Sequence, residues 1–158
     1  MELVDSARFS ADAFAAQNTI SLGMPRTAAY LDRLLERTNF YLAQVEPDIV
    51  RSRNPLRGEP AEFAQQRFSA EHAILPGILI CLPARPEQTR SLLLIGKYPN
   101  GMTPLLISVE GLKQLEEQWV KGGSPEGWEM VVKAEIFRDT ALKAWPVAFR
   151  PIPRDFWK

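Results

Sequence analysis

The chain has 158 residues, of which 46% are hydrophobic and 24% are charged. This length and composition are typical of one globular domain with its own core, and they exclude a disordered tail. The 19 basic and 19 acidic residues cancel, so no net field draws the whole molecule to nucleic acid, anionic lipid or a polyanionic substrate.

A single cysteine cannot form an internal disulfide, and the first thirty residues contain no basic segment that leads into a continuous apolar run. We therefore expect a cytoplasmic protein. The longest apolar run, residues 73–84, is shorter than the ~20 residues that cross a bilayer, and prolines interrupt it. We expect this run to be buried core, and we expect no membrane contact.

The first part of the chain is predicted to be helical. Ser10 can cap a helix over 10–18, and residues 25–47 show a stronger pattern that begins at Pro25 and ends at Pro47. Within this stretch, apolar residues recur at helical spacing and form one face: Leu31, Leu35, Leu42 and Val45. The charged residues between them are expected to form a solvated face.

The middle of the chain changes character twice. Residues 47–71 lose the helical periodicity and gather prolines and polar residues, so we interpret them as a long connection. Short runs of large apolar residues then predict three antiparallel strands, over 73–84, 91–98 and 102–109. Asn100 and Gly101 favour the positive φ angles of a tight hairpin between the last two of these strands.

The C-terminal part is predicted to contain one helix and further strands. Ser108 is expected to cap a helix that Gly122 and Gly123 end, and one side of this helix is expected to be apolar, with Val109, Leu112, Leu115 and Trp119. Residues 128–137 alternate, which predicts a strand with one wet face and one dry face, the latter made of Met130, Val132, Ala134 and Ile136. The tail is expected to pair as an edge strand near 147–149 and then to leave as an extended, polyproline-like segment.

This order predicts an α+β fold: N-terminal helices, then a mainly antiparallel sheet of three strands, a helix and one or two strands, with an extended Pro/aromatic C-terminal tail. We predict one domain over 1–158. It is divided into a helical part, a connection and a sheet-based part, over 1–46, 47–71 and 72–158.

His72 and Cys81, each the only residue of its kind, are the obvious pair for nucleophilic catalysis. If 72–81 is one regular strand, nine steps of roughly 3.3 Å separate them by about 30 Å and turn them to opposite faces. Cys81 lies between Ile80 and Leu82, so we expect a buried thiol of high pKa. Without phosphate-binding loops or clustered metal ligands, we predict no catalytic residue, no cofactor and no metal site.

Two segments are candidates for binding. The C-terminal segment combines aromatic residues and arginines, which dominate interface hot spots, and we predict an interaction element made of Trp145, Phe149, Arg150, Arg154, Phe156 and Trp157. The alternative is that this tail folds back over its own core. A second candidate is the loop over 51–57, where an anion or an acidic partner could be held by Arg51, Arg53 and Arg57.

We interpret the chain as a non-catalytic protein–protein interaction module, such as an adaptor, a chaperone-like or immunity-like protein, or a small subunit of a larger assembly. It would bind through its sheet edge, its helix face or its aromatic tail. The expected partner is another protein, and a homodimer is an open alternative. Two other functions stay open: an enzyme that uses carboxylates near Glu71 and His72, and a nucleic-acid accessory protein that uses the arginine loop, although nucleic acid is not the expected partner.

Overall fold

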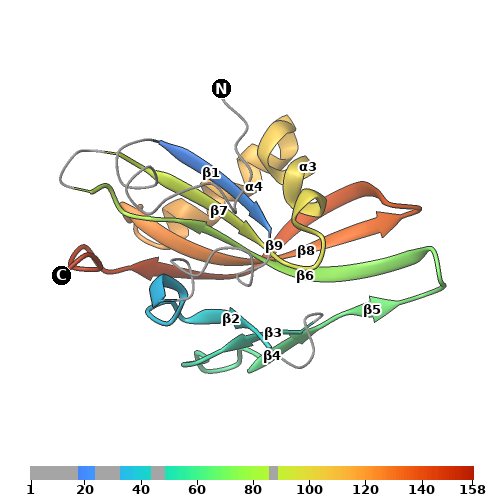
Figure 1. Cartoon of the computed structure of the whole chain (residues 1–158), viewed down its shortest axis with the longest axis horizontal. Helices are drawn as coiled ribbons and strands as arrows, with labels where there is room; N and C mark the ends of the chain where they lie inside the picture. The colour runs from blue at the N-terminus through green and yellow to red at the C-terminus, as the bar shows by residue number, and fades with distance from the viewer. Residues whose placement is uncertain (1–17, 24–32, 44–48, 86–88) are drawn as a thin grey trace.

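A computed structural model describes residues 18–23, 33–43, 49–85 and 89–158 of the chain. Figure 1 shows a larger sheet with helices on one side of it and a smaller sheet on the other. Of the described residues, 45% lie in strands and 20% in helices. The prediction of N-terminal helices followed by a sheet is therefore wrong, because the protein is mostly β and its helices come late in the chain.

The larger sheet contains six strands: β1 (Thr19–Gly23), β5 (Gln66–Arg67), β6 (His72–Cys81), β7 (Ser91–Ile95), β8 (Gly127–Phe137) and β9 (Thr140–Ile152). Its main order is β1, β7, β6, β8, β9, and β5 pairs with the start of β6. β1 is parallel to β7, while the other pairs are antiparallel. Residues 75–80 of the central strand β6 are all buried, as expected for a strand that is covered on both faces.

The smaller sheet is antiparallel and contains β2 (Phe40–Leu42), β3 (Ile49–Ser52) and β4 (Glu62–Ala64). It covers one face of the larger sheet through a shared apolar core, to which the two sheets contribute Phe40, Val50, Phe63, Ile78, Ile80 and Val131. The predicted connection over 47–71 therefore carries three strands, β3, β4 and β5.

The predicted helix over 25–47 lies only partly within the described residues. Residues 33–35 are helical, but the chain then turns and enters β2 at Phe40. The Phe40 side chain is fully buried, and its backbone N–H donates to the carboxylate of Glu129. Tertiary contacts thus outweigh the local helical pattern. The other predicted N-terminal helix, apart from Asn18, lies outside the described residues.

The third predicted strand and its hairpin are also wrong. The chain forms a 3₁₀ turn, η3 (Pro99–Met102), which leads directly into the short helix α3 (Thr103–Ile107). Leu105 is fully buried in the second core of the protein. A Cβ at Gly101 would lie 2.9 Å from the Ile136 side chain. The glycine therefore allows η3 to approach β8 closely, rather than forming a hairpin turn.

The predicted helix after Ser108 is confirmed as α4 (Val109–Lys121), and the Ser108 hydroxyl accepts the backbone N–H of Gly111 at 2.9 Å. α3 and α4 lie on the face of the larger sheet opposite the smaller sheet (Figure 1). Gly111 is buried and Leu115 packs against the second core, whereas Val109, Leu112 and Trp119 are exposed, so the helix covers only part of the apolar side that its sequence predicts. Among the described residues, no helix has the length and apolar character needed to cross a membrane.

β8 confirms the predicted strand and its dry face of Met130, Val132, Ala134 and Ile136. The opposite face is not wet as predicted, because Glu129 and Val131 are buried on that face. β9 is longer than predicted and continues through Pro146 and Pro151 to Ile152 instead of leaving as a polyproline-like segment. Among the described strands it forms an edge of the sheet, where a proline need not donate to a neighbouring strand.

Candidate functional site

His72 and Cys81 lie at the two ends of β6, as the prediction of one regular strand requires. Cys81 is partly buried, and this burial raises the pKa of its thiol, while the charge of Arg90 lowers it to a smaller extent. A protonated thiol is a poor nucleophile. The structure thus separates the two residues and gives the cysteine the environment predicted for an unreactive side chain.

His72 belongs to a charged cluster that crosses β6, β8 and β9. Its Nε2 lies 2.8 Å from Oε1 of Glu135, and Nζ of Lys143 lies 3.1 Å from the other oxygen of that carboxylate. The imidazole also packs against the rings of Phe68 and Phe137, at 4.8 and 5.8 Å between centroids. The hydrogen bonds from His72 and Lys143 lower the pKa of Glu135. The cluster ties the three strands together at one end of the sheet.

The lowered pKa of Glu135 makes stability depend on pH. Such a carboxylate stabilises the fold above its unfolded-state pKa, and this contribution is lost as the pH falls through the folded-state pKa. We expect the wild type to lose more of its free energy of unfolding than Glu135→Gln when the pH falls from about 5 to about 3. Urea denaturation at each pH measures the difference, with Asp155→Asn at an exposed position near the C-terminus as the control. Equal acid sensitivity of wild type and Glu135→Gln would contradict the expectation.

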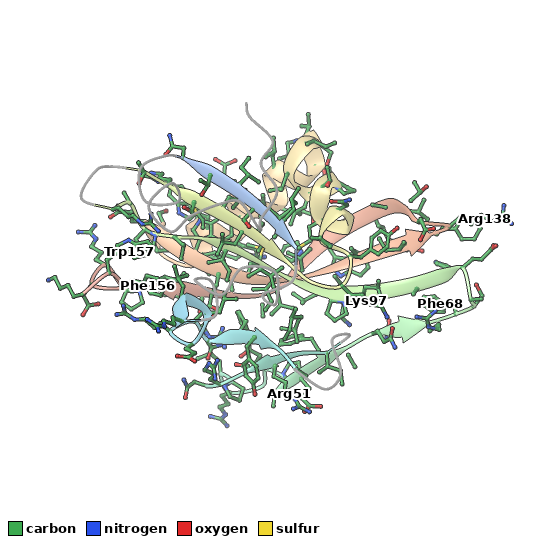
Figure 2. The ribbon with its side chains drawn as sticks, in the orientation of Figure 1. Arg51, Phe68, Lys97, Arg138, Phe156 and Trp157 are labelled. Carbon is green, nitrogen blue, oxygen red and sulfur yellow. The ribbon has the colours of Figure 1, made fainter. Side chains whose placement is uncertain are left out.

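A carboxylate enzyme would need an acid of raised pKa in a polar cleft near Glu71 and His72. Glu71 is exposed, and its Oε2 lies 2.7 Å from Nε of Arg138. Figure 2 shows Arg138 and Phe68 at the same end of the molecule, beyond the smaller sheet. The carboxyl group beside His72 belongs to Glu135, whose pKa is lowered. Among the described carboxyl groups, the one whose pKa is raised lies elsewhere on β8, at Glu129.

Glu129 lies between the two sheets and is 3% exposed. Its Oε1 accepts the backbone N–H of Asn39 at 2.7 Å, and its Oε2 accepts that of Phe40 at 2.8 Å. Burial raises the pKa of Glu129, while these two hydrogen bonds and the charges of Arg150 and Arg53 lower it to a smaller extent. Both oxygens are therefore engaged in joining β8 to the smaller sheet, and this carboxylate is a structural group.

Arg150, one of the residues predicted to bind a partner, turns inward. It pairs with Glu59, whose carboxylate also accepts the backbone N–H of Leu56 at 3.0 Å. Its guanidinium lies over the ring of Phe40, 5.4 Å from the centroid, and its register partner on β8 is Glu129. Arg150 thus continues the polar network around Glu129 into the loop that precedes β4.

The end of the tail packs on the body of the protein. Phe156 is 3% exposed within the core shared by the two sheets, and the indole N–H of Trp157 donates to the carbonyl of Pro83 at 2.9 Å. Figure 2 shows Phe156 and Trp157 side by side near the C-terminus. Phe149 packs against the second core, and Arg154 is exposed. Binding of a partner by these residues stays a prediction, but most of their side chains already hold contacts within the chain.

In the predicted arginine loop, two of the three arginines also make contacts within the chain. Nε of Arg51 lies 2.8 Å from Oε1 of Glu62, its register partner across β3 and β4. Nε of Arg53 donates to the carbonyl of Thr38 at 3.0 Å. Arg57 is exposed on the loop, and Figure 2 shows Arg51 on the outside of the smaller sheet. Two of the three guanidinium groups therefore stabilise the smaller sheet and its neighbouring turn.

A groove of about 500 Å³ lies between the helices and β9. The helices line it with Pro104, Ser108, Glu110, Gly111 and Gln114, and β9 lines it with Leu142, Lys143, Ala144 and Trp145. Successive side chains of a strand point to opposite faces, so a groove that touches four consecutive residues lies against the edge of the strand. Among the described strands, β9 pairs with β8 alone, and an edge of this kind presents unpaired backbone groups.

One polar atom in the wall of the groove lacks a hydrogen bond. Oε1 of Gln114 is buried and accepts no hydrogen bond from the described residues. Nε2 of the same side chain lies 3.3 Å from Oε1 of Glu110, which distinguishes the donor from the acceptor end of the amide. A buried acceptor without a donor costs about 1–3 kcal/mol. The atom has almost no accessible surface, so a bound N–H could supply the missing donor after a rotation of the Gln114 side chain into the groove.

The helices also turn apolar side chains to solvent. Ile107 is 75% exposed, and three residues of α4 are at least half exposed: Val109 at 74%, Leu112 at 50% and Val120 at 57%. Exposed apolar patches of this kind mark interaction surfaces. The spacing of the apolar residues in α4 would instead suit a side of the helix that is buried. The difference arises because α4 packs inward through glycines.

Comparison of the chain with protein-family models, curated proteins and solved structures found no match. The groove and the exposed side of α4 must therefore be interpreted from their geometry and chemistry. The two surfaces are distinct, because Val109, Leu112 and Val120, which are exposed, do not line the groove.

Proposed function

We propose that this protein is a non-catalytic protein-interaction module that binds an extended peptide segment of its partner along β9. The observation that carries the proposal is the groove beside the edge of β9, where the buried Oε1 of Gln114 lacks a donor. An extended segment brings free backbone N–H and C=O groups. These groups match both the edge of a sheet and an acceptor without a donor.

The edge of β9 favours a short segment. Pro146 has no N–H to offer. The register with β8 shifts between Glu135 and Ile136, which pair with Lys143 and Ala141, so Leu142 forms a bulge. Prolines and bulges shorten the part of an edge strand that can pair with a strand of another chain. Strand addition is thereby confined to the few residues beside the groove, which favours one short peptide over edge-to-edge aggregation.

The lining of the groove indicates which segment would fit. Ala144 is small and buried, so it leaves room for one apolar side chain of the ligand. Glu110 and Lys143 place opposite charges on exposed positions of the lining. We therefore expect an extended segment with one apolar residue between polar neighbours. A backbone N–H near that residue would donate to Oε1 of Gln114 once that side chain rotates into the groove.

This mode of binding suits an adaptor, a chaperone-like or immunity-like protein, or a small subunit of a larger assembly, and we propose the cytoplasm as its location. The proposal does not extend to a carboxylate enzyme, because Glu135 is held in an ion-paired cluster and Glu129 is locked between the sheets. It does not extend to nucleic acid, because Arg51 is paired with Glu62.

Peptides selected from a displayed library of short random sequences provide the probe. We expect Gln114→Leu to weaken binding of the selected peptides about five- to tenfold, which corresponds to the loss of one buried hydrogen bond. The free energy of unfolding should not fall, because the substitution removes a buried acceptor that lacks a donor. Calorimetric titration gives the affinity and urea denaturation gives the stability.

Gln118→Leu is the matched control, since it makes the same substitution on α4 at a residue that does not line the groove. It should leave the affinity unchanged. A selection that enriches no peptide would overturn the proposal. So would selected peptides that bind wild type, Gln114→Leu and Gln118→Leu with equal affinity.

A further inference from the structure

We infer that the exposed side of α4 binds a second copy of this chain in an antiparallel, two-fold symmetric arrangement. The surface, which we call the α4 stripe, consists of Val109, Leu112, Lys113, Glu116, Trp119 and Val120. Its apolar members are 38–74% exposed. The inference does not depend on peptide binding in the groove, because no residue of the stripe lines that groove.

Close packing holds the stripe outward. A Cβ at Gly111 would lie 2.5 Å from the backbone oxygen of Leu105, and a Cβ at Gly122 would lie 2.1 Å from the ring of Phe149. Only glycine allows this side of the helix to approach α3 and β9 so closely. The two glycines therefore fix the rotation of α4, and the apolar stripe faces solvent as a consequence of that packing.

The stripe has the shape of a helix–helix interface. At about 100° per residue, Val109, Lys113, Glu116 and Val120 project within about 60° of one another. They form the centre of the exposed side. Leu112 and Trp119 lie together along one flank of it, so the surface is apolar at both ends and along one flank, with two opposite charges in the middle.

The stripe is complementary to itself when two copies run antiparallel. If the two-fold axis passes between residues 114 and 115, Val109 lies opposite Val120 of the second copy. The same axis places Lys113 opposite Glu116 of the second copy. It also brings Leu112 beside Trp119 of the second copy on the same flank. Each contact occurs twice by symmetry, so the apolar residues meet apolar residues and the charges meet opposite charges.

Other arrangements fit less well. A parallel pair of identical helices would place Lys113 against Lys113 and Glu116 against Glu116, and like charges in direct contact are unfavourable. Glu117 gives further support to the antiparallel pair, because it lies on the same flank as Lys113 of the second copy. The charge pattern thus selects a second copy of this chain as the partner and determines its direction.

Sedimentation velocity over a range of protein concentrations tests this interface. We expect the wild type to dimerise. Lys113→Glu and Glu116→Lys, each alone, place like charges at both symmetric contacts and should raise the dimer dissociation constant about tenfold. The double variant Lys113→Glu/Glu116→Lys restores the complementary pairs and should return the constant to within about threefold of the wild type.

The double variant separates this inference from a different use of the same surface. A partner other than a second copy would not carry the reciprocal changes, so the double variant would not restore its binding. Arg57→Glu, on an exposed loop of the smaller sheet, is the control for net charge and should have no effect. A wild type that stays monomeric would overturn the inference. A double variant that associates no better than the single variants would overturn it as well.

Discussion

Replacing Glu129 with alanine is expected to lower the free energy of unfolding by about 3–5 kcal/mol, the cost of breaking a buried charged network by removing one partner. The carboxylate is buried and accepts the backbone N–H groups of Asn39 and Phe40. Alanine leaves both donors without an acceptor. It also leaves Arg150, the register partner of Glu129 on β8, without that nearby negative charge.

Urea denaturation of wild type and Glu129→Ala measures this loss. Glu129→Gln should lose less, because the amide oxygen can still accept one of the two hydrogen bonds. Glu62→Ala is the control for an exposed carboxylate, since its ion pair with Arg51 is expected to contribute at most about 1 kcal/mol. A loss below about 1 kcal/mol for Glu129→Ala would contradict the assignment of this residue as the link between the sheets.

Gly111→Ala is expected to lower the free energy of unfolding by about 2–3 kcal/mol, the cost of overpacking a tight contact. Helix propensity alone predicts the opposite sign, a gain of up to about 1 kcal/mol. The loss is expected because the new Cβ would lie 2.5–2.7 Å from backbone atoms of Leu105. A backbone, unlike the end of a flexible side chain, cannot turn away.

Thermal or urea denaturation measures the effect, and Gly96→Ala is the matched control. The nearest atom to a Cβ at Gly96 would be the Cα of Gly77 at 3.4 Å, an ordinary contact. We therefore expect the control to change stability by less than about 1 kcal/mol. A Gly111→Ala variant as stable as the wild type would contradict the close contact between α4 and α3. It would then also contradict the explanation given for the outward orientation of the α4 stripe.

Local sequence signals predicted correctly those elements whose tertiary position agrees with their pattern. The cap at Ser108 and the stop at Gly122 define α4, because both act through hydrogen bonds within a few residues. The alternation in β8 predicted its dry face, since that face is buried beneath the helices. The other face of β8 was predicted to be exposed to solvent, because no local feature of the sequence shows that the smaller sheet covers Glu129.

Elements that depend on distant contacts could not be predicted in this way. The apolar spacing around Leu35 and Leu42 fits a helix, yet the chain enters β2 at Phe40, where buried contacts and the hydrogen bond to Glu129 favour a strand. The turn at Gly101 fits a hairpin, but it packs against β8 at a distance that only glycine allows. In both places the decisive partner is far away in sequence.

The same reason explains which parts of the candidate site were missed. The groove forms only when Gln114 is brought beside Trp145, and neither residue stands out in its own segment. The α4 stripe was missed because apolar residues are expected to face inward, and the sequence does not show that Gly111 occupies the inward position instead. The aromatic tail was noticed, but the burial of Phe156 depends on the folded sheets.

Amide hydrogen exchange of β9, with and without a selected peptide, tests the central claim of peptide binding most directly. If an extended segment adds to the edge, the amides between Thr140 and Trp145 that point away from β8 should gain protection. Those that point toward β8 are already hydrogen-bonded and should change little. Protection that appears on other elements, with β9 unchanged at saturating peptide, would contradict the claim.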